Sequence, residues 1–297
     1  MKYSGRKPFK VHAWGIGLLI LGGILAVLWL SSLTALAYLP IRPLVGGEGY
    51  VIPPMARGQI IRQVELPDSE KAIALTFDDG PTPQLTAPIL DILQTYHVPA
   101  TFFWVGQNVQ RFPALVEKAA RAGHTLGNHT WHHPTGLLTP FRATQEVEST
   151  RRVIYQTIGR KTPWFRPPFG HLHNGLVSYA RSQNDTIILW SVDSEDWRVK
   201  NFSVAQMVEQ VLSNIKPGAI VLFHDGRGSR LLSPTQNLPP IVQALPLILE
   251  ALHQQGYHFV TVPQLLQLRE QTTSRPSASG TSTLFLPPTS PAPHPGG

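Results

Sequence analysis

The chain has 297 residues, a formal net charge of +7 at pH 7 and no cysteine. Without cysteine it has no disulfide, thiol nucleophile or zinc–thiolate site, so any bound metal must be held by His, Asp or Glu. Four of its 25 basic residues lie in the first ten positions and no long Lys/Arg block follows, so nothing specific indicates nucleic-acid binding.

The N-terminal segment predicts one transmembrane helix. Residues 13–39 carry no charge and are almost wholly apolar, and a helix of about 20 residues is enough to cross the hydrocarbon layer. The cationic residues lie just before it, in 1–12, which places the N-terminus in the cytoplasm and the rest of the chain outside. We therefore expect a single-pass anchor in the cytoplasmic membrane. The alternative is secretion after signal cleavage near Ala37.

The remaining chain divides into three parts by composition. Residues 40–68 contain scattered Pro and Gly, which is typical of a juxtamembrane linker. Residues 271–297 are rich in Pro, Ser and Thr and almost uncharged, which predicts a disordered tail. The segment 69–270 lies between them and is long enough for one domain with a sizeable core.

Strand and helix patterns alternate within 69–270. Short apolar runs predict buried parallel strands at 72–77, 100–105, 186–192 and 219–223. Helix patterns with recognisable ends run from Pro140 to Gly159, from the Ser203/Gln206 capping box to about Lys216, and over 238–255. The alternation gives six or seven β/α units and predicts an α/β fold, a closed or nearly closed barrel of parallel strands with its site at their C-terminal ends.

Two adjacent carboxylates follow the first predicted strand, in Asp78-Asp79-Gly80-Pro81. They repel each other unless a cation lies beside them. Asp, Gly and Pro also form turns, so a plain turn is the alternative. The mouth of a parallel sheet is where ligands bind, and this favours a functional role.

A histidine cluster follows further along the chain. His129 and His133 are four residues apart, a spacing that lets two imidazoles hold one metal ion. Zinc proteases with this spacing have Glu after the first His, but here the residue is Thr130. The base must then come from elsewhere, and the aspartate pair is the obvious source. His132 lies between the two candidate ligands and receives no role.

Three further segments carry polar groups just past strand-like runs. In Arg166-Pro167-Pro168-Phe169-Gly170 the prolines fix the backbone and leave the last two amides free for a ligand, while Arg166 can form a bidentate pair with a carboxylate. Residues 190–197 combine acidic side chains with tryptophans, which suits a carbohydrate groove. A histidine, His224, follows the run 219–223. Each signal alone also fits a structural residue, but together they predict one site.

The combined motifs resemble those of polysaccharide deacetylases that share the NodB homology domain, carbohydrate esterase family 4. The resemblance covers about residues 71–268, and all five family motifs occur in order. They are TFDDG (76–80), HTWHH (129–133), RPPFG (166–170), DSEDW (193–197) and LFH (222–224).

The resemblance implies an irregular (β/α) barrel of about seven parallel strands. It also implies a metal-dependent hydrolase that removes N-acetyl groups from an amino-sugar polymer. Asp79, His129 and His133 would bind one divalent metal ion, with zinc as the first expectation and cobalt or nickel as alternatives. Asp78 would be the general base and His224 the general acid.

Five further residues receive roles from the same resemblance. Arg166 would orient the base and pair with it. Asp193 would hold the acid and favour its charged form. The Phe169 amide would donate to the oxyanion, and Leu222 and Trp197 would line the acetyl pocket.

The expected partners are a polysaccharide and, through the N-terminal helix, the membrane; no protein partner can be inferred. Peptidoglycan N-acetylglucosamine is the first substrate expected of a domain that faces the cell wall. Chitooligosaccharides and poly-N-acetylglucosamine are alternatives, as is a carbohydrate O-acetyl esterase of the xylan type on the same catalytic residues. A non-catalytic glycan-binding protein is a remote alternative, because this chain keeps the base, the ligands and the acid.

Overall fold

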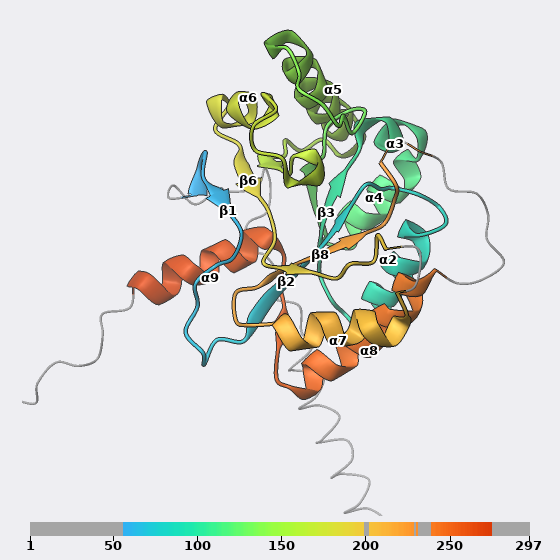
Figure 1. Cartoon of the computed structure of the whole chain (residues 1–297), viewed down its shortest axis with the longest axis vertical. Coiled ribbons are helices and arrows are strands. Elements are labelled where there is room, and N and C mark those ends of the chain that lie inside the picture. Colours follow the sequence, from blue (N-terminus) through green and yellow to red (C-terminus); the bar gives the residue numbers. More distant parts are fainter. Residues whose placement is uncertain (1–55, 199–201, 229, 231–238, 275–297) are drawn as a thin grey trace, which may run out of the picture.

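The computed structural model of the chain describes residues 56–198, 202–228, 230 and 239–274. In these residues the chain forms one nine-stranded sheet with helices packed around it (Figure 1). The strands are β1 (Ile60–Ile61), β2 (Ala72–Asp78), β3 (Thr101–Trp104), β4 (Thr125–Asn128), β5 (Trp164–Phe165), β6 (Thr186–Ile188), β7 (Val192–Asp193), β8 (Ile220–His224) and β9 (His258–Phe259).

Every strand pairing in this sheet is parallel, and the sheet curls into a half-barrel. The predicted α/β architecture is therefore confirmed in its coarse form. The number of strands differs, because β1, β5, β7 and β9 have two residues each and are too short to give a pattern. β1 also lies in the segment expected to be a linker, so the folded part begins earlier than predicted.

The strand order shows how the half-barrel is arranged. The order is β1-β6-β5-β4-β3-β2-β8-β7, and β9 pairs with β2. The prediction of one strand over 186–192 is wrong. The run forms β6 and the start of β7, which lie near opposite ends of this order. Leu189 N–H still donates to the carbonyl of Ile61 in β1, whereas Ser191 N–H donates to the carbonyl of Ile220 at the start of β8.

Helices follow most of the strands. They are α2 (Thr86–Thr95), α3 (Gly106–Arg111), α4 (Pro113–Arg121), α5 (Pro140–Ile158), α6 (Leu176–Ser182), α7 (Val204–Asn214), α8 (Pro240–Gln254) and α9 (Val262–Ser274), with the short 3-10 turn η2 (Pro168–Gly170). The predicted helix ends are confirmed at Pro140, at Gly159 (φ 68°) and at the Ser203/Gln206 capping box. α9 runs four residues into the segment that we expected to be a tail.

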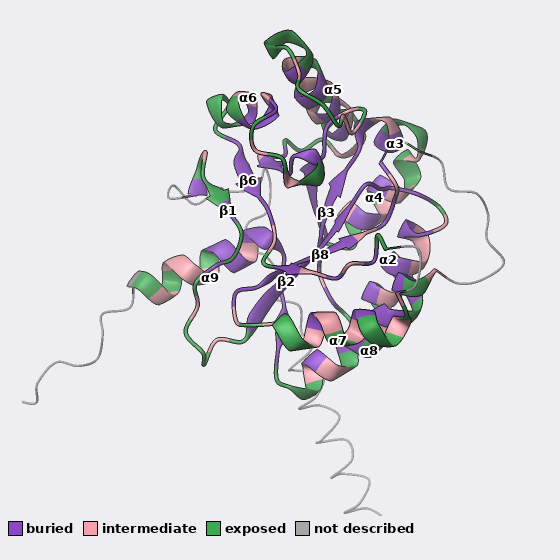
Figure 2. Ribbon diagram, in the orientation of Figure 1, coloured by how far each residue is buried: buried purple, intermediate pink, exposed green. Residues whose placement is uncertain are grey.

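The core lies on both faces of the sheet. All seven residues of β2 are buried, which is typical of a parallel strand covered on both sides (Figure 2). Phe77 stacks on Phe102 and Phe223 with ring centroids 5.1 and 5.4 Å apart, and this aromatic row packs with α2, α4, α7 and α8. Leu265 and Leu266 of α9 pack with Ala72 and Ala74 near the start of β2.

Among the described residues, none of the helices has the length and apolar character needed to cross a membrane. The predicted span, 13–39, lies outside the described residues, as do 40–55 and 275–297.

Candidate active site and metal centre

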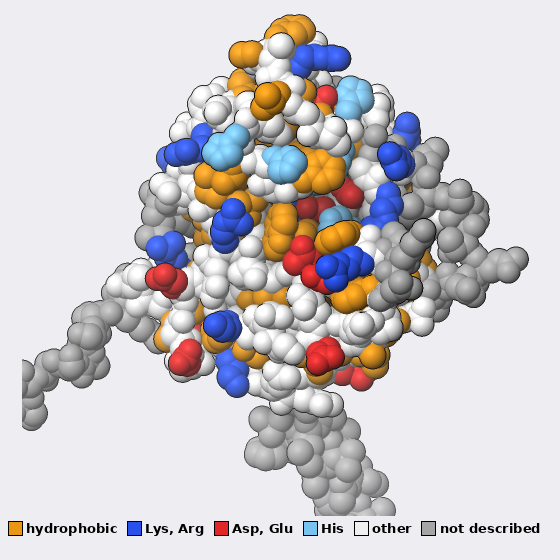
Figure 3. All heavy atoms as spheres, in the orientation of Figure 1, with side chains coloured by type: hydrophobic (Ala, Val, Ile, Leu, Met, Phe, Trp, Pro, Cys, Tyr) orange, Lys and Arg blue, Asp and Glu red, His pale blue; other side chains and the backbone are white. Residues whose placement is uncertain are grey.

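The predicted site residues come together at the C-terminal ends of the parallel strands. A groove of about 820 Å³ opens there, and in the space-filling view acidic, histidine and apolar side chains gather around a hollow on this face (Figure 3). Nine of the ten predicted site residues line it: Asp78, Asp79, His129, His133, Phe169, Asp193, Trp197, Leu222 and His224. The tenth, Arg166, is fully buried and hydrogen-bonds to Asp78.

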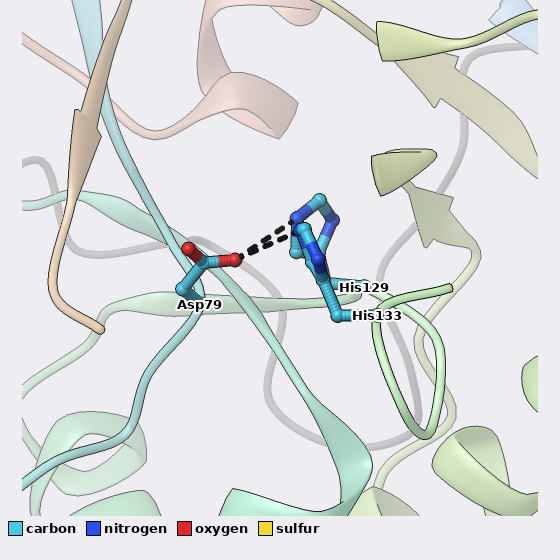
Figure 4. A group of neighbouring side chains, drawn as sticks. All are labelled: Asp79, His129 and His133. Carbon is cyan, nitrogen blue, oxygen red and sulfur yellow. Dashed lines mark ion pairs between the residues drawn. The ribbon is translucent and has the colours of Figure 1, made fainter. Parts of the chain in front are cut away.

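Three predicted metal ligands form a compact group. Asp79 follows β2, while His129 and His133 lie in the loop after β4, and one oxygen of Asp79 faces both imidazoles (Figure 4). Asp79 Oδ1 lies 3.1 Å from His133 Nε2 and 3.5 Å from His129 Nε2. One ligand atom from each of the three residues lies within 4.8 Å of the others.

The tautomer of His129 suits a metal ligand. Its Nδ1 lies 2.7 Å from the carbonyl oxygen of Arg166, and a carbonyl oxygen only accepts. Nδ1 therefore carries a proton, so Nε2, which faces Asp79, is the ring nitrogen left to bind a metal ion. A metal-binding histidine is held in this way, with its outer nitrogen donating to a backbone carbonyl.

The protonation states of Asp79 and His133 suit metal binding. Burial alone would raise the pKa of Asp79, but the imidazoles of His129 and His133 hold it well below its usual range. Burial, with the neighbouring charge of His129, lowers the pKa of His133 to about 4. Burial opposes protonation of His129, but Asp78 and Asp79 raise its pKa overall. At neutral pH the site thus holds an ionised carboxylate and a neutral His133.

This arrangement fits a divalent metal. Asp79 Oδ1 is buried and accepts no hydrogen bond from any described residue, although both imidazoles lie within ion-pair distance of it. A cation held between the three side chains would supply the interaction that this oxygen lacks. Ligands about 2.1 Å from a tetrahedral ion are roughly 3.4 Å from each other, close to the spacings seen here. Three protein ligands would leave a coordination position for water or substrate, as catalytic zinc sites do.

Asp78 is held by a buried arginine. Arg166 Nη1 donates to Asp78 Oδ1 at 2.7 Å and to Thr76 Oγ1 at 2.9 Å. Its Nε and Nη2 donate to the carbonyls of Ile188 and Leu189, both at 2.9 Å. The expected pairing of Arg166 with Asp78 is present, but the expected bidentate fork is not, because the other two nitrogens bind backbone.

The partner of His224 differs from the prediction. Asp196, not Asp193, holds it: Oδ1 lies 2.7 Å from His224 Nδ1, and Oδ2 accepts the His224 backbone N–H at 2.7 Å. Asp193 instead accepts the backbone N–H of Glu195 at 2.8 Å, which forms the turn that carries Asp196 back to β8. Burial alone would lower the pKa of His224, but Asp196 raises it to about 9.

The groove has an apolar side. Phe169 has a left-handed backbone (φ 58°) and is 53 % exposed, and its ring meets His133 edge-on at 4.6 Å. The Gly170 amide was expected to be free for a ligand, but it donates to the Pro167 carbonyl at 3.0 Å. Leu222 is buried in the groove wall, whereas Trp197 is 48 % exposed at its rim.

Two acidic residues that support the site were missed by the sequence reasoning. Glu146 of α5 accepts the backbone N–H groups of Trp131 and His132 and pairs with His132 Nδ1 at 2.7 Å. His132 therefore helps to hold the loop that carries His129 and His133. Asp225 follows His224 and is fully buried, and burial raises its pKa to about 7. Asp225 could have been suspected as the neighbour of a site histidine, whereas nothing in the sequence points to Glu146.

Comparison with known proteins gives consistent matches. Residues 65–187 match the family described as "Polysaccharide deacetylase". A peptidoglycan-N-acetylglucosamine deacetylase of Bacillus cereus is 39 % identical over 210 residues, covering 69 % of this chain and 92 % of the relative. A chitooligosaccharide deacetylase of a Bradyrhizobium species is 34 % identical over 200 residues, covering 66 % of this chain and 90 % of the relative.

A solved structure is similar as well. The Bc1960 peptidoglycan N-acetylglucosamine deacetylase, in complex with 4-naphthalen-1-yl-N-oxidanyl-benzamide, superposes with a TM-score of 0.62 at 33 % identity. The match covers 71 % of this chain and 94 % of that one.

Proposed function

Because the chain belongs to the polysaccharide deacetylase family, we propose that it removes N-acetyl groups from an amino-sugar polymer outside the cytoplasmic membrane. We propose peptidoglycan N-acetylglucosamine as the substrate. The names of the Bacillus cereus and Bc1960 relatives support this choice. The Bradyrhizobium relative makes chitooligosaccharides the second candidate.

One observation carries the proposal: two differently supported acid–base groups flank a set of metal ligands. Asp78 and His224 are register partners on the neighbouring strands β2 and β8. The metal-ligand group lies next to Asp78, whose Oδ2 is 3.7 Å from His129 Nε2. Amide hydrolysis needs a base for the attacking water and an acid for the departing amine, and this groove offers both within one opening.

Asp79, His129 and His133 would hold the metal, and two imidazoles with one carboxylate suit zinc, cobalt or nickel; we propose zinc. When bound, a divalent ion there would acidify water and polarise the acetyl carbonyl. The buried Asp79 oxygen that lacks a hydrogen-bond donor, and the two imidazole nitrogens that face it, support a metal ion at this position.

The proton transfers fall to the two flanking groups. Asp78 accepts the proton of the attacking water, and Arg166 keeps its carboxylate oriented. His224 donates from Nε2, since its Nδ1 is held by Asp196. Its raised pKa keeps it protonated near neutrality, so it can deliver a proton to the amine nitrogen.

The remaining groove residues would bind the acetyl group. The Phe169 backbone N–H would donate to the developing oxyanion. Leu222 and Trp197 would contact the acetyl methyl from the apolar side of the groove. Asp193, placed at the rim, is left to shape the turn that carries Asp196.

The location outside the membrane is part of the proposal. It rests on the apolar, uncharged run 13–39 and the four basic residues in the first ten positions. An uncleaved anchor is proposed, and cleavage near Ala37 would export the same domain.

Mass spectrometry tests the proposal directly. Full-length protein is incubated with muropeptides, chitooligosaccharides and acetylated xylan, with and without prior chelation. We expect loss of acetyl groups and appearance of free amines on muropeptides, abolished by chelation and restored by added zinc. Free amines on chitooligosaccharides alone would move the substrate to the second candidate. Deacetylation of xylan alone would replace the proposal by an O-acetyl esterase.

A further inference from the structure

The peptide bond between Asp79 and Gly80 is held at both of its polar ends by buried side chains. The Nδ2 of Asn108, in α3, donates to the Asp79 carbonyl at 2.8 Å. The Gly80 N–H donates to Asp225 Oδ1 at 3.0 Å. Because a peptide bond is planar, fixing its carbonyl and its N–H fixes the orientation of the whole unit.

Asp79 needs such support because of its backbone. Its φ is +79°, in the left-handed region that residues with a Cβ adopt at a cost. The preceding peptide is also fixed, since the Asp79 N–H donates to the Phe103 carbonyl at 3.2 Å. Both peptide units that flank the Asp79 Cα are thus anchored, and this sets the direction in which the carboxylate leaves the backbone.

Asp225 is itself built into the core. Its Oδ2 accepts hydrogen bonds from Thr86 Oγ1 at 2.6 Å and from Trp104 Nε1 at 2.8 Å. Gly80 lies so close to Asp225 that an added Cβ would be 2.2 Å from the Asp225 carboxylate. The Asp225 carboxylate, fixed by Thr86 and Trp104, therefore accepts the Gly80 N–H from a well-defined position.

Asn108 links this peptide to a second ligand. The same Nδ2 also donates to the Gly228 carbonyl at 2.9 Å, and Asn108 is fully buried. Gly228 lies against the ring of His133, where an added Cβ would be 3.3 Å from the ring atoms. The Asn108 side-chain amide thus links the backbone of Asp79 to Gly228, which packs on His133.

We propose that Asn108 and Asp225 are positioning residues, which hold Asp79 at the spacing from the imidazoles that metal binding requires. The inference rests on the proposed metal site and adds the two side chains on which its affinity depends. Neither contacts the substrate groove, so both act through the Asp79 backbone.

The test is zinc affinity at pH 8, measured on purified full-length protein by competition with a chromophoric chelator. Asn108→Asp keeps the shape and the oxygen that faces Arg111 but removes both N–H donors. Asp225→Asn removes the charged acceptor. For each variant we expect zinc affinity to fall by roughly 10- to 100-fold, the usual effect of losing a residue that orients a metal ligand.

Asn174→Asp is the matched control. Asn174 is also buried, its Nδ2 has no partner among the described residues, and its Oδ1 accepts the Leu176 N–H at 3.3 Å, which aspartate can also do. Zinc affinity should stay at the wild-type value. The melting temperature of each metal-free protein is measured alongside, because a merely structural residue would lower it and leave the affinity of the folded protein unchanged.

The outcomes separate the two proposals. A wild-type chain that binds no zinc overturns the proposed metal site itself. A wild-type chain that binds zinc, with a folded Asn108→Asp or Asp225→Asn protein that binds it within twofold as tightly, overturns only the positioning role. If neither variant folds while Asn174→Asp does, the two side chains support the fold instead, and the positioning role is again overturned.

Discussion

Asp78 and Asp79 are neighbours in the chain and differ in their surroundings. Asp78 ends β2, with its carboxylate bound to Arg166 at 2.7 Å. Asp79 turns into the left-handed region and presents an unbonded oxygen to two imidazoles. Identical side chains can therefore be assigned different roles, one as base and one as ligand.

Replacing Asp78 with Asn tests that division. The amide keeps the size of the side chain but cannot take a proton, so kcat should fall by roughly 10²–10⁴, the usual contribution of general acid–base catalysis. Zinc content, measured by atomic absorption, should stay at the wild-type level. Asp79→Asn is the control and should lose zinc. Near-normal turnover by Asp78→Asn would mean that another group is the base.

The His224–Asp196 pair predicts the alkaline side of the pH profile. Asp196 raises the pKa of His224 to about 9, so the protonated acid should persist above pH 8 in the wild type. Asp196→Asn removes this charge, and we expect the alkaline limb of kcat to move to lower pH. Asp193→Asn should leave the limb in place, because Asp193 bonds to the Glu195 backbone instead. Equal shifts in the two variants would contradict the pairing.

The same pair links stability to pH. The pKa of His224 is higher in the folded protein than its ordinary value of 6.5, so folding favours the protonated form. Its contribution to the free energy of unfolding is complete below pH 6.5 and is lost as the pH rises towards 9. Denaturant titrations across this window should therefore show a smaller decline in Asp196→Asn than in the wild type.

Among the helices, α7 has the clearest sequence-encoded beginning. Ser203 Oγ accepts the Gln206 N–H, and Gln206 Oε1 accepts the Ser203 N–H, which completes the capping box. Ser203→Ala should lower the free energy of unfolding by roughly 0.5–2 kcal/mol with kcat unchanged. Ser213→Ala, an exposed position in the same helix, is the matched control and should change stability by less than about 0.5 kcal/mol. Chemical denaturation measures both.

Elements of this kind explain why much of the fold could be predicted from the sequence. β2 is mostly apolar and is bounded by polar residues, and α5 begins at a proline and ends at a left-handed glycine, so local rules suffice. The run 186–192 misled because its apolar character says nothing of which neighbour each half bonds to. Strands of two residues, such as β5, have no period to detect.

The position of a site residue could be predicted where it follows a strand. It was harder to predict where a turn reverses the chain. Asp78, Asp79 and His224 lie at strand ends, and the structure places them together. Asp193 and Asp196 belong to one motif, and which of them meets His224 depends on the turn between them. Asn108 could not be identified, because its partners are backbone carbonyls distant in sequence.

At the scale of the whole molecule, the groove-bearing domain is predicted to face outward from the membrane. The basic residues before 13–39 carry this prediction. Protease added to intact bacterial cells or spheroplasts should remove the catalytic domain, detected by an antibody to a C-terminal tag. A cytoplasmic protein in the same cells is the control and should survive. Protection of the domain would reverse the orientation and remove the argument for a wall-facing substrate.

The division of the run 186–192 into two short strands also affects how readily a strand from another molecule could add to the sheet. The terminal strands of the sheet, β1 and β7, have two residues each. A short border strand presents few backbone N–H and C=O groups to which a strand from another molecule could add. Within the described part of the chain, the nine-stranded sheet therefore offers little template for intermolecular β-sheet growth.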